Sequence, residues 1–427
     1  MKPYPKYKDS GVEWIGEVPE EWEVKKLKFF SKVIMGQSPN SADCNQNGTG
    51  MPFLQGNAEF SHKYPNAKNW CADPPKLTKK DDVLISVRAP IGALNIADQV
   101  YGIGRGLSAV RASNPIYLFY MLSTAKEKLL SLGTGSTFTA ISSEQLGNML
   151  LPEASSEEQT AIATFLDRKT AEIDKLIANK ERLIKLYEEK KQAVINQAVT
   201  KGLDPDAEMR ESGVEWLGEI PEHWEVLQLD YLIRVKARLG WKGLKASEYV
   251  PEGYGFLSTP NIKGAEIDYE TINFISEDRY LESPEIMLQY NDVLLAKDGS
   301  TLGIVNIVKK LPFACTVNSS IAVLRVVRKE KILPDFLKYF MSCEAMQQVI
   351  ERVKGGMGVP HLFQGDINKF KLLSPTIMEQ TAIVHHIETQ CSRIDAIINK
   401  LKKQINLFKE YRTALISEAV TGKIQIK

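Results

Sequence analysis

The pattern of apolar residues divides this chain into two long periodic segments and two stretches of shorter apolar runs. In residues 157–200, apolar side chains recur every three or four positions, and the segment contains no glycine or proline. Residues 379–420 repeat the same spacing. The pattern predicts two helices, each about 65 Å long and each with one narrow apolar face.

A small globular domain cannot cover such a face along its whole length. The economical arrangement packs the two helices against each other as a coiled coil. We therefore expect Leu183 and Leu401 to lie in the apolar seam between the helices, with the other apolar positions of the repeat.

The segments that precede these helices have a different pattern of apolar residues. Short apolar runs, such as residues 82–87 and 292–296, are followed by glycines and a further apolar run. This is typical of strands separated by turns. Each segment then reaches a proline, Pro115 or Pro334, that can open a helix. We expect two α+β domains of similar plan.

The chain also contains an internal duplication. Residues 10–24, S-G-V-E-W-I-G-E-V-P-E-E-W-E-V, return at 212–226 as S-G-V-E-W-L-G-E-I-P-E-H-W-E-V, and E-Q-T-A-I at 158–162 returns at 379–383. Two copies of one unit in a single chain predict internal pseudo-twofold symmetry, which runs the two long helices antiparallel. Outside the shared skeleton the copies barely match, as expected if each domain binds a different target.

Composition narrows the class of protein. With 427 residues the chain is long enough for two to four domains. Its five cysteines include no C-x-x-C pair, which argues for reduced thiols and against a disulfide framework or a zinc site. The sequence has neither a signal-peptide core nor an 18-residue apolar run, so we expect a cytoplasmic protein.

The net charge of +1 does not by itself suggest a nucleic-acid partner, but one local stretch does. Basic side chains gather around an aromatic residue, with no acidic residue among them, at Arg234, Lys236, Arg238, Trp241, Lys242 and Lys245. Such a segment suits a loop that lies along phosphates. A solvated turn accounts for it equally well.

No motif carries convincing catalytic chemistry. Asn114-Pro115-Ile116-Tyr117 resembles the N-P-P-Y signature of amino-methyltransferases but lacks its second proline, and Asn114 is better interpreted as a helix N-cap. The glycine-rich segments 102–106 and 133–136 lack the spacing of nucleotide-binding loops. As flexible loops they could still present Arg105, Ser136 and Thr137 to a DNA backbone. Simple tight turns account for these segments at least as well.

Four tryptophans lie in the duplicated arms, at Trp14, Trp22, Trp216 and Trp224. Their segments contain proline and glycine and lack helical periodicity. The indoles could fasten an extended arm to its domain, or they could form a docking surface for a partner that binds twice. The sequence leaves both interpretations open.

The order domain, long helix, domain, long helix resembles the specificity subunit of type I restriction–modification enzymes. The resemblance covers essentially the whole chain and is strongest in the paired arms and the E-Q-T-A-I helix starts. Patterns that look like those of target recognition domains are P-F-L-Q-G-N at 52–57, D-V-L-I-S-V-R-A-P-I-G at 82–92, G-I-G-R-G-L at 102–107, G-W-K-G-L at 240–244 and N-D-V-L-L-A-K-D-G at 291–299.

The resemblance implies an architecture. An arm and the first target recognition domain would occupy residues 1–155, followed by a central helical spacer at 156–203. A second arm and target recognition domain would occupy 204–373, and a C-terminal spacer 374–427. Each recognition domain would read one half of a bipartite DNA site, and the spacers would set the gap.

The resemblance also implies partners. The chain would be non-catalytic and would bind no cofactor itself; two methyltransferase subunits would use S-adenosylmethionine to methylate adenine N6, and restriction subunits would add ATP- and Mg²⁺-dependent cleavage. A coiled-coil protein scaffold that does not read bases is the alternative. Candidate DNA-binding residues are Gln55, Asn57, Arg88, Arg105, Ser136, Thr137, Lys236, Arg238, Trp241, Lys242 and Lys297.

Overall fold

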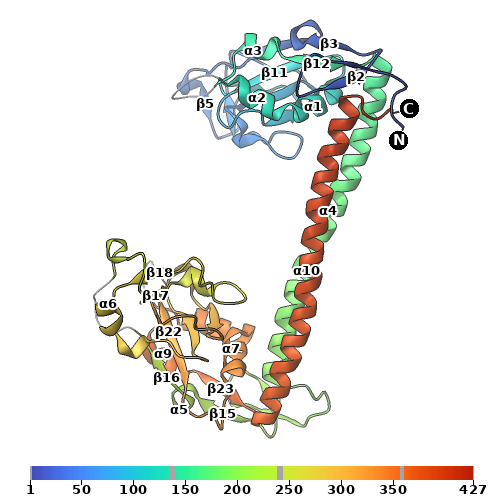
Figure 1. The fold of residues 1–427 in the computed structure, drawn as a ribbon. Helices are drawn as coiled ribbons and strands as arrows, with labels where there is room; N and C mark the ends of the chain where they lie inside the picture. The colour runs from blue at the N-terminus through green and yellow to red at the C-terminus, as the bar shows by residue number, and fades with distance from the viewer. Residues whose placement is uncertain (1, 134–139, 238–243, 356–359, 427) are drawn as a thin grey trace. The chain divides into compact units, whose positions relative to one another are not determined.

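A computed structural model describes residues 2–133, 140–237, 244–355 and 360–426. The chain forms two compact units, Met1–Glu181 with Lys402–Lys427 and Arg182–Leu401. Each unit contains one α+β domain and one segment of each long helix (Figure 1). No helix in the described ranges is long and apolar enough to cross a membrane.

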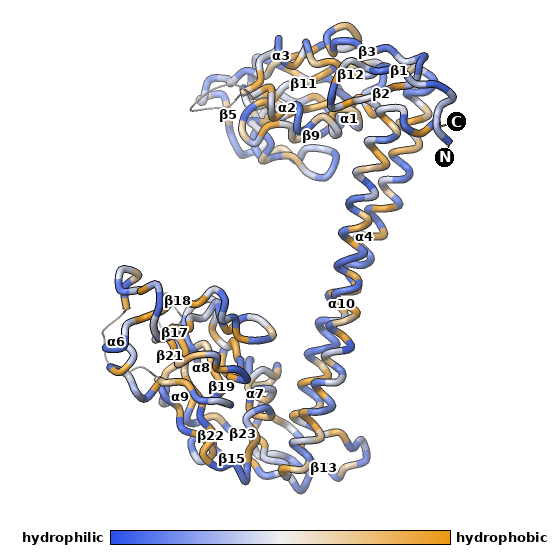
Figure 2. The backbone as a smooth tube through the Cα atoms, in the orientation of Figure 1, coloured by the Kyte–Doolittle hydropathy of each residue, from blue (hydrophilic) through white to orange (hydrophobic). Residues whose placement is uncertain are grey.

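The two long helices are α4, Ser156–Lys201, and α10, Ile377–Val420. Their segments run antiparallel within each unit, as predicted. In the first unit Lys180 Nζ lies 2.8 Å from Gln404 Oε1 and Arg412 Nε lies 3.0 Å from Asp174 Oδ1. In the second unit Lys191 Nζ lies 2.7 Å from Asp395 Oδ2. Apolar and polar residues alternate along both helices (Figure 2).

The seam is narrower than the sequence pattern predicted. Ile173 and Ile195 of α4 and Ile394 and Ile398 of α10 are buried in their respective units. Leu183, however, is 43 % exposed, so the expectation that it lies in the seam was wrong. Two helices that pair alone cover only a thin stripe of each other, and apolar residues at the edge of that stripe stay in contact with water.

The domain of the first unit contains two four-stranded sheets and two two-stranded antiparallel ribbons. One sheet has the order β4-β11-β8-β9 and the other the order β10-β6-β7-β5. The ribbons pair β1 with β2 and β12 with β3. The strands are β1 Tyr7–Asp9, β2 Glu17–Pro19, β3 Glu23–Lys26, β4 Ser31–Met35, β5 Cys44–Asn45, β6 Met51–Leu54, β7 Asn69–Cys71, β8 Val83–Ser86, β9 Leu94–Ile96, β10 Gly102–Ile103, β11 Leu107–Ala112 and β12 Leu150–Glu153. The helices are α1 Pro115–Thr124, α2 Lys126–Leu132 and α3 Ser143–Gly147, with 3-10 turns η1 Leu27–Phe29, η2 Ser41–Asp43 and η3 Asn57–Glu59.

The second unit repeats this plan. Its sheets have the orders β16-β22-β19-β20 and β18-β17-β21, and its ribbons pair β13 with β14 and β15 with β23. The strands are β13 Met209–Glu211, β14 Glu219–Pro221, β15 Glu225–Gln228, β16 Ile233–Lys236, β17 Tyr254–Leu257, β18 Asn273–Ile275, β19 Val293–Ala296, β20 Val305–Ile307, β21 Cys315–Val317, β22 Ile321–Val326 and β23 Lys371–Ser374. The helices are α5 Leu229–Leu232, α6 Glu277–Leu281, α7 Pro334–Ser342, α8 Glu344–Val353 and α9 Gln364–Asn368, with 3-10 turns η4 Ala246–Glu248, η5 Thr259–Ile262, η6 Pro284–Ile286 and η7 Gly299–Thr301.

The strand β19 is apolar at every position and β8 is apolar except at the buried Ser86, because both faces of their sheets are covered. Side chains alternate between the faces of a strand. Val293 and Leu295 of β19 therefore join the core that contains the helices, whereas Leu294 and Ala296 join the core beneath the second sheet. The strand β8 divides its side chains in the same way. This double burial explains the runs that predicted these strands.

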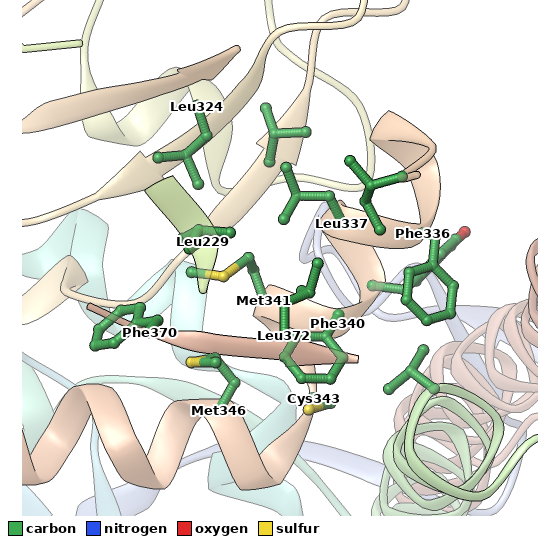
Figure 3. Packing of buried hydrophobic residues seen from close by; sticks show 14 of the residues in the cluster. Leu229, Leu324, Phe336, Leu337, Phe340, Met341, Cys343, Met346, Phe370 and Leu372 are labelled. Atoms are coloured by element: carbon green, nitrogen blue, oxygen red, sulfur yellow. The ribbon is translucent and has the colours of Figure 1, made fainter. Parts of the chain in front are cut away.

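The helices that follow the sheets begin where the prolines predicted. Pro115 and Pro334 each occupy the first turn of their helix, and the Asn114 side chain accepts a hydrogen bond from the Tyr117 amide at 3.0 Å. The N-cap interpretation of Asn114 is confirmed. In the second unit, Phe336 and Phe340 of α7 pack among Leu324 and other apolar residues from the sheet and from α8 (Figure 3).

Candidate nucleic-acid interface

Three candidate residues of the first domain meet at the ends of two parallel strands. The strand β6 pairs in parallel with β10, although about 50 residues separate them in sequence. The Gly104 amide donates to the Leu54 carbonyl at 2.8 Å, so the segment after β10 lies directly beside Gln55. Gln55 and Arg105 are exposed and Asn57 is half-buried. The structure therefore brings Gln55, Asn57 and Arg105 into one edge of the domain, the β6–β10 edge.

Glycine is required in this edge because two backbones approach closely. A Cβ atom on Gly106 would lie 2.7 Å from the carbonyl oxygen of Gln55, and one on Gly104 would lie 3.0 Å from Gln55 Oε1. Real side chains cannot occupy the first position without moving the backbone. In the pattern G-I-G-R-G, the exposed Arg105 thus lies between two glycines, Gly104 and Gly106, that both pack closely against Gln55.

Arg88 belongs to the same edge through the end of β8. The Val87 amide donates to the Gly106 carbonyl at 2.9 Å, and the exposed Arg88 follows it. Arg88 also forms an isolated β-bridge with Ala140. The candidates Ser136 and Thr137, in the segment just before Ala140, lie outside the described residues.

The second domain builds the same edge with different side chains. The strand β17 pairs in parallel with β21, and the Asn318 amide donates to the Leu257 carbonyl at 2.8 Å. The Lys297 amide donates to the Ser320 carbonyl at 2.8 Å, as Val87 does to Gly106. Ser258, Asn318 and Ser319 therefore occupy the positions of Gln55, Gly104 and Arg105. The sequence analysis missed these three residues, because the second copy lacks the glycine pattern that marks the loop.

The position of Arg88 is taken in the second domain by an acidic residue. Asp298 forms a β-bridge with His361, and His361 Nδ1 contacts Asp298 Oδ1. The Lys297 Nζ lies 3.3 Å from Asp298 Oδ2. Lys297, a candidate DNA-binding residue, is only 9 % exposed, so its side chain supports Asp298 in this structure. Asp298 and His361 were also missed from the sequence, since they are far apart along the chain.

The basic stretch of the second domain is only partly described. Lys236 is half-buried at the end of β16. Arg238, Trp241 and Lys242 lie outside the described residues. No group of three or more His, Cys, Asp or Glu that could hold a metal ion occurs in the part of the chain that the structure describes.

Two of the four arm tryptophans fasten the arms to the long helices. Trp22 and Trp224 are each 1 % exposed. Their indole N–H groups donate to Glu158 Oε2 at 3.2 Å and to Glu379 Oε1 at 3.3 Å. Their packing agrees with the fastening interpretation, and neither indole is accessible to a partner in this structure.

Trp14 and Trp216 are half-buried and remain candidates for docking. Trp14 lines an open groove of about 570 Å³, together with Lys128 and Leu132 of α2. Trp216 packs against Phe340, with ring centroids 6.3 Å apart.

Two domains with one backbone plan and different exposed side chains are what a protein that reads two targets requires. The family model described as the type I restriction modification DNA specificity domain matches residues 19–186 and 221–407. The chain belongs to this family. The two matches cover the two copies that the sequence duplication predicted.

Individual specificity subunits extend the similarity. The putative type I restriction enzyme MjaX specificity subunit of Methanocaldococcus jannaschii is 42 % identical over 193 residues, which is 44 % of this chain and 44 % of that protein. The MjaVIII specificity subunit of the same organism is 24 % identical over 426 residues, covering 96 % of this chain and 94 % of its own. The EcoBI specificity subunit of Escherichia coli is 23 % identical over 447 residues, covering 97 % and 89 %.

Solved structures of this class share the fold. A chain from a study of complex assembly and conformational transition of the type I R-M system matches with a TM-score of 0.73 at 15 % identity, covering 95 % of this chain and 99 % of that one. The HsdS subunit from Thermoanaerobacter tengcongensis matches with a TM-score of 0.54 at 16 % identity, covering 95 % and 98 %. The family and the fold predicted from the sequence are confirmed.

Proposed function

We propose that this chain is the non-catalytic DNA-reading subunit of a type I restriction–modification complex, in which each domain reads one half of a bipartite site. The β6–β10 edge of the first domain, with Gln55, Asn57, Arg88 and Arg105, contacts one half-site. The equivalent edge at Ser258, Asn318 and Asp298 contacts the other. Lys236, Arg238, Trp241 and Lys242 position the second domain on phosphates, as Ser136 and Thr137 do for the first.

The observation that carries this proposal is the pair of edges with one backbone geometry and different side chains. Arginine and glutamine can each make two hydrogen bonds to one base, to guanine and adenine respectively, whereas serine and asparagine offer other patterns. Equivalent hydrogen bonds, Gly104 to Leu54 and Asn318 to Leu257, hold the two edges in the same form. A shared backbone geometry lets both domains dock on DNA in the same way, while their different side chains give them different base preferences.

The catalytic steps belong, in this proposal, to partner subunits. Two methyltransferase subunits dock on the two copies and methylate adenine N6 with S-adenosylmethionine. Restriction subunits, where present, supply ATP- and Mg²⁺-dependent cleavage. The repeated arms, with Trp14 and Trp216, are the proposed docking elements because one partner type that binds twice needs two similar surfaces.

A domain exchange tests the proposal. Residues 30–150 are replaced by the first domain of another family member, and methylated adenines are mapped by sequencing in cells that carry the chimera and its partners. One half of the methylated sequence is expected to change while the other half stays the same. A continuous recognition sequence, or a change in both halves, contradicts the proposal; DNA binding without base preference favours the scaffold alternative.

A second experiment tests the spacers. One heptad is inserted into α4 and one into α10, which lengthens each helix by about 10 Å, or about 3 base pairs of DNA. The gap between the methylated half-sites is expected to lengthen while the bases of both halves stay the same. A change in the bases contradicts the spacer role.

A further inference from the structure

Two cysteine thiols of the first unit lie opposite each other on neighbouring strands. Cys44 of the edge strand β5 and Cys71 of β7 are direct register partners in an antiparallel pair. The Ala72 amide donates to the Asp43 carbonyl at 3.0 Å, so Asp43 and Ala72 form a hydrogen-bonded pair. Hydrogen-bonded and non-hydrogen-bonded pairs alternate along an antiparallel ladder, so the next pair, Cys44 and Cys71, is non-hydrogen-bonded. The Cα atoms of such a pair are about 4.5 Å apart, within the roughly 4.4–6.8 Å that a disulfide needs.

The two thiols differ in access to solvent. Cys71 is fully buried, whereas Cys44 is half-buried and can be reached from the edge of the sheet. Burial, followed by a hydrogen bond with the Cys71 thiol, raises the pKa of the Cys44 thiol. The remaining cysteines, Cys315, Cys343 and Cys391, are buried and have no cysteine as a strand partner. The strand register of the two thiols and the partial exposure of Cys44 therefore set the pair apart from the other thiols, whose pKa values burial also raises.

We propose that Cys44 and Cys71 are a site of reversible thiol oxidation, at which a low-molecular-weight disulfide such as oxidised glutathione converts them into a cross-strand disulfide. The Cys44 thiolate attacks one sulfur of oxidised glutathione, which releases one reduced glutathione and leaves a mixed disulfide. The Cys71 thiolate then attacks Cys44 Sγ and releases the second. Two protein thiols are oxidised, one small disulfide is reduced to two thiols, and the two thiol protons pass to the released glutathione.

The disulfide would constrain the segment that it closes. Residues 45–70 contain β6, Gln55 and Asn57. Cross-linking β5 to β7 restricts the openings of this segment because the ends of the loop can no longer separate. In the second unit the described sheet β18-β17-β21 has no strand in the place of β5, so this cross-strand cysteine pair belongs to the first domain. An effect on reading of the first half-site rests on the proposed function; the disulfide itself does not.

The test uses the full chain with oxidised glutathione at two pH values, followed by intact mass and by peptide mapping without reductant. The expected product is lighter by two hydrogen atoms, contains one Cys44–Cys71 peptide pair and reverts with a reducing agent. Its formation speeds up at the higher pH, because thiolate is the reacting species. Hydrogen exchange over residues 45–70 is expected to slow about tenfold or more in the oxidised chain.

Matched variants locate the reaction. Cys44→Ser is expected to abolish the intramolecular disulfide, whereas Cys391→Ala is expected to leave it unchanged. Oxidation at other cysteines, linkage between two chains, or a stable glutathione adduct on Cys44 beside a free Cys71 overturns the proposal. The peptide map of the unsubstituted chain decides the question even if a variant fails to fold. Unchanged exchange over residues 45–70 overturns the proposed constraint.

Discussion

The indole nitrogen of Trp22 lies 3.2 Å from the carboxylate of Glu158 and donates a hydrogen bond to it. Glu158 also accepts from the Tyr4 hydroxyl at 2.9 Å and from the Ser155 amide at 3.2 Å, while Ser155 Oγ accepts from the Glu158 amide. One carboxylate therefore completes the capping box of α4 with Ser155 and fastens the arm. Trp224 and Glu379 repeat the contact in the second unit.

Replacing Glu158 is expected to destabilise the first unit. Glu158→Ala removes the acceptor of the Ser155 amide, although Ser155 Oγ still caps the helix, and it leaves the buried Trp22 and Tyr4 donors without their acceptor. The expected cost is about 2–4 kcal/mol in the free energy of unfolding, measured in urea. The exposed neighbour serves as the control, since Glu157→Ala is expected to cost at most about 1 kcal/mol. Equal costs for the two variants would contradict the role of Glu158.

The stability of the second unit is expected to fall at acid pH because of Glu379. Burial acts to raise the pKa of Glu379, but hydrogen bonds from His223, Thr376 and Trp224 together lower it below its usual range. A lowered pKa in the folded state stabilises the fold above the unfolded pKa of about 4.3, and this contribution is lost as the pH falls through the folded pKa. The unfolding free energy of the chain should therefore fall more steeply below pH of about 4 than that of Glu379→Gln. Parallel pH profiles would refute this.

The buried ion pair of the second unit is expected to be sensitive to loss of its carboxylate. Asp292 is 1 % exposed and accepts from Arg325 Nε at 2.7 Å and from the Gln289 amide at 2.7 Å. Asp292→Asn removes the charge that pairs with Arg325, with an expected cost of about 3–5 kcal/mol by chemical denaturation. The exposed Asp278→Asn is the control, at about 0.5 kcal/mol or less. The first unit repeats the pair as Asp82 and Arg111, and Asp82→Asn should behave alike.

The seam between the helices is expected to tolerate charge only at its edge. Ile394 is 4 % exposed, whereas Leu183 is 43 % exposed. Ile394→Asp places a carboxylate among apolar side chains and should cost at least about 3 kcal/mol. Leu183→Asp, the matched change, should cost under about 1 kcal/mol. Far-ultraviolet circular dichroism during denaturation measures both, and a larger loss at Leu183 would place the seam elsewhere.

Arg105 is expected to affect one half-site alone. If it reads a base in the first half, Arg105→Ala should weaken binding of the assembled complex by about 1–3 kcal/mol and relax the preference at one position of that half. Lys80→Ala is the control because it removes an equal charge at the other end of β8 from Arg88. This change should leave base preference unchanged. Binding to DNA variants of each half-site separates the two effects. A uniform loss across all variants would indicate a phosphate contact.

The periodic patterns allowed the helices, several strands and the duplication to be predicted from the sequence. A helix of 46 residues such as α4 repeats its apolar spacing often enough to exclude other structures, and Pro115 and Pro334 mark helix starts through local geometry. The resemblance in the arms and helix starts supplied the family. These signals are local or repeated along the chain, so they can be recognised without knowledge of the fold.

The sequence by itself determined the two-copy plan, the long helices and the class of protein, because each depends on spacing along the chain. The tertiary structure alone decided which tryptophans are buried, that Leu183 stays at the edge of the seam, and that Lys297 supports Asp298. It also brought Gln55 beside Gly104 and Cys44 opposite Cys71. These pairings join residues far apart in sequence, and their register is fixed by sheet hydrogen bonds and burial on two faces, which no single segment of the chain encodes.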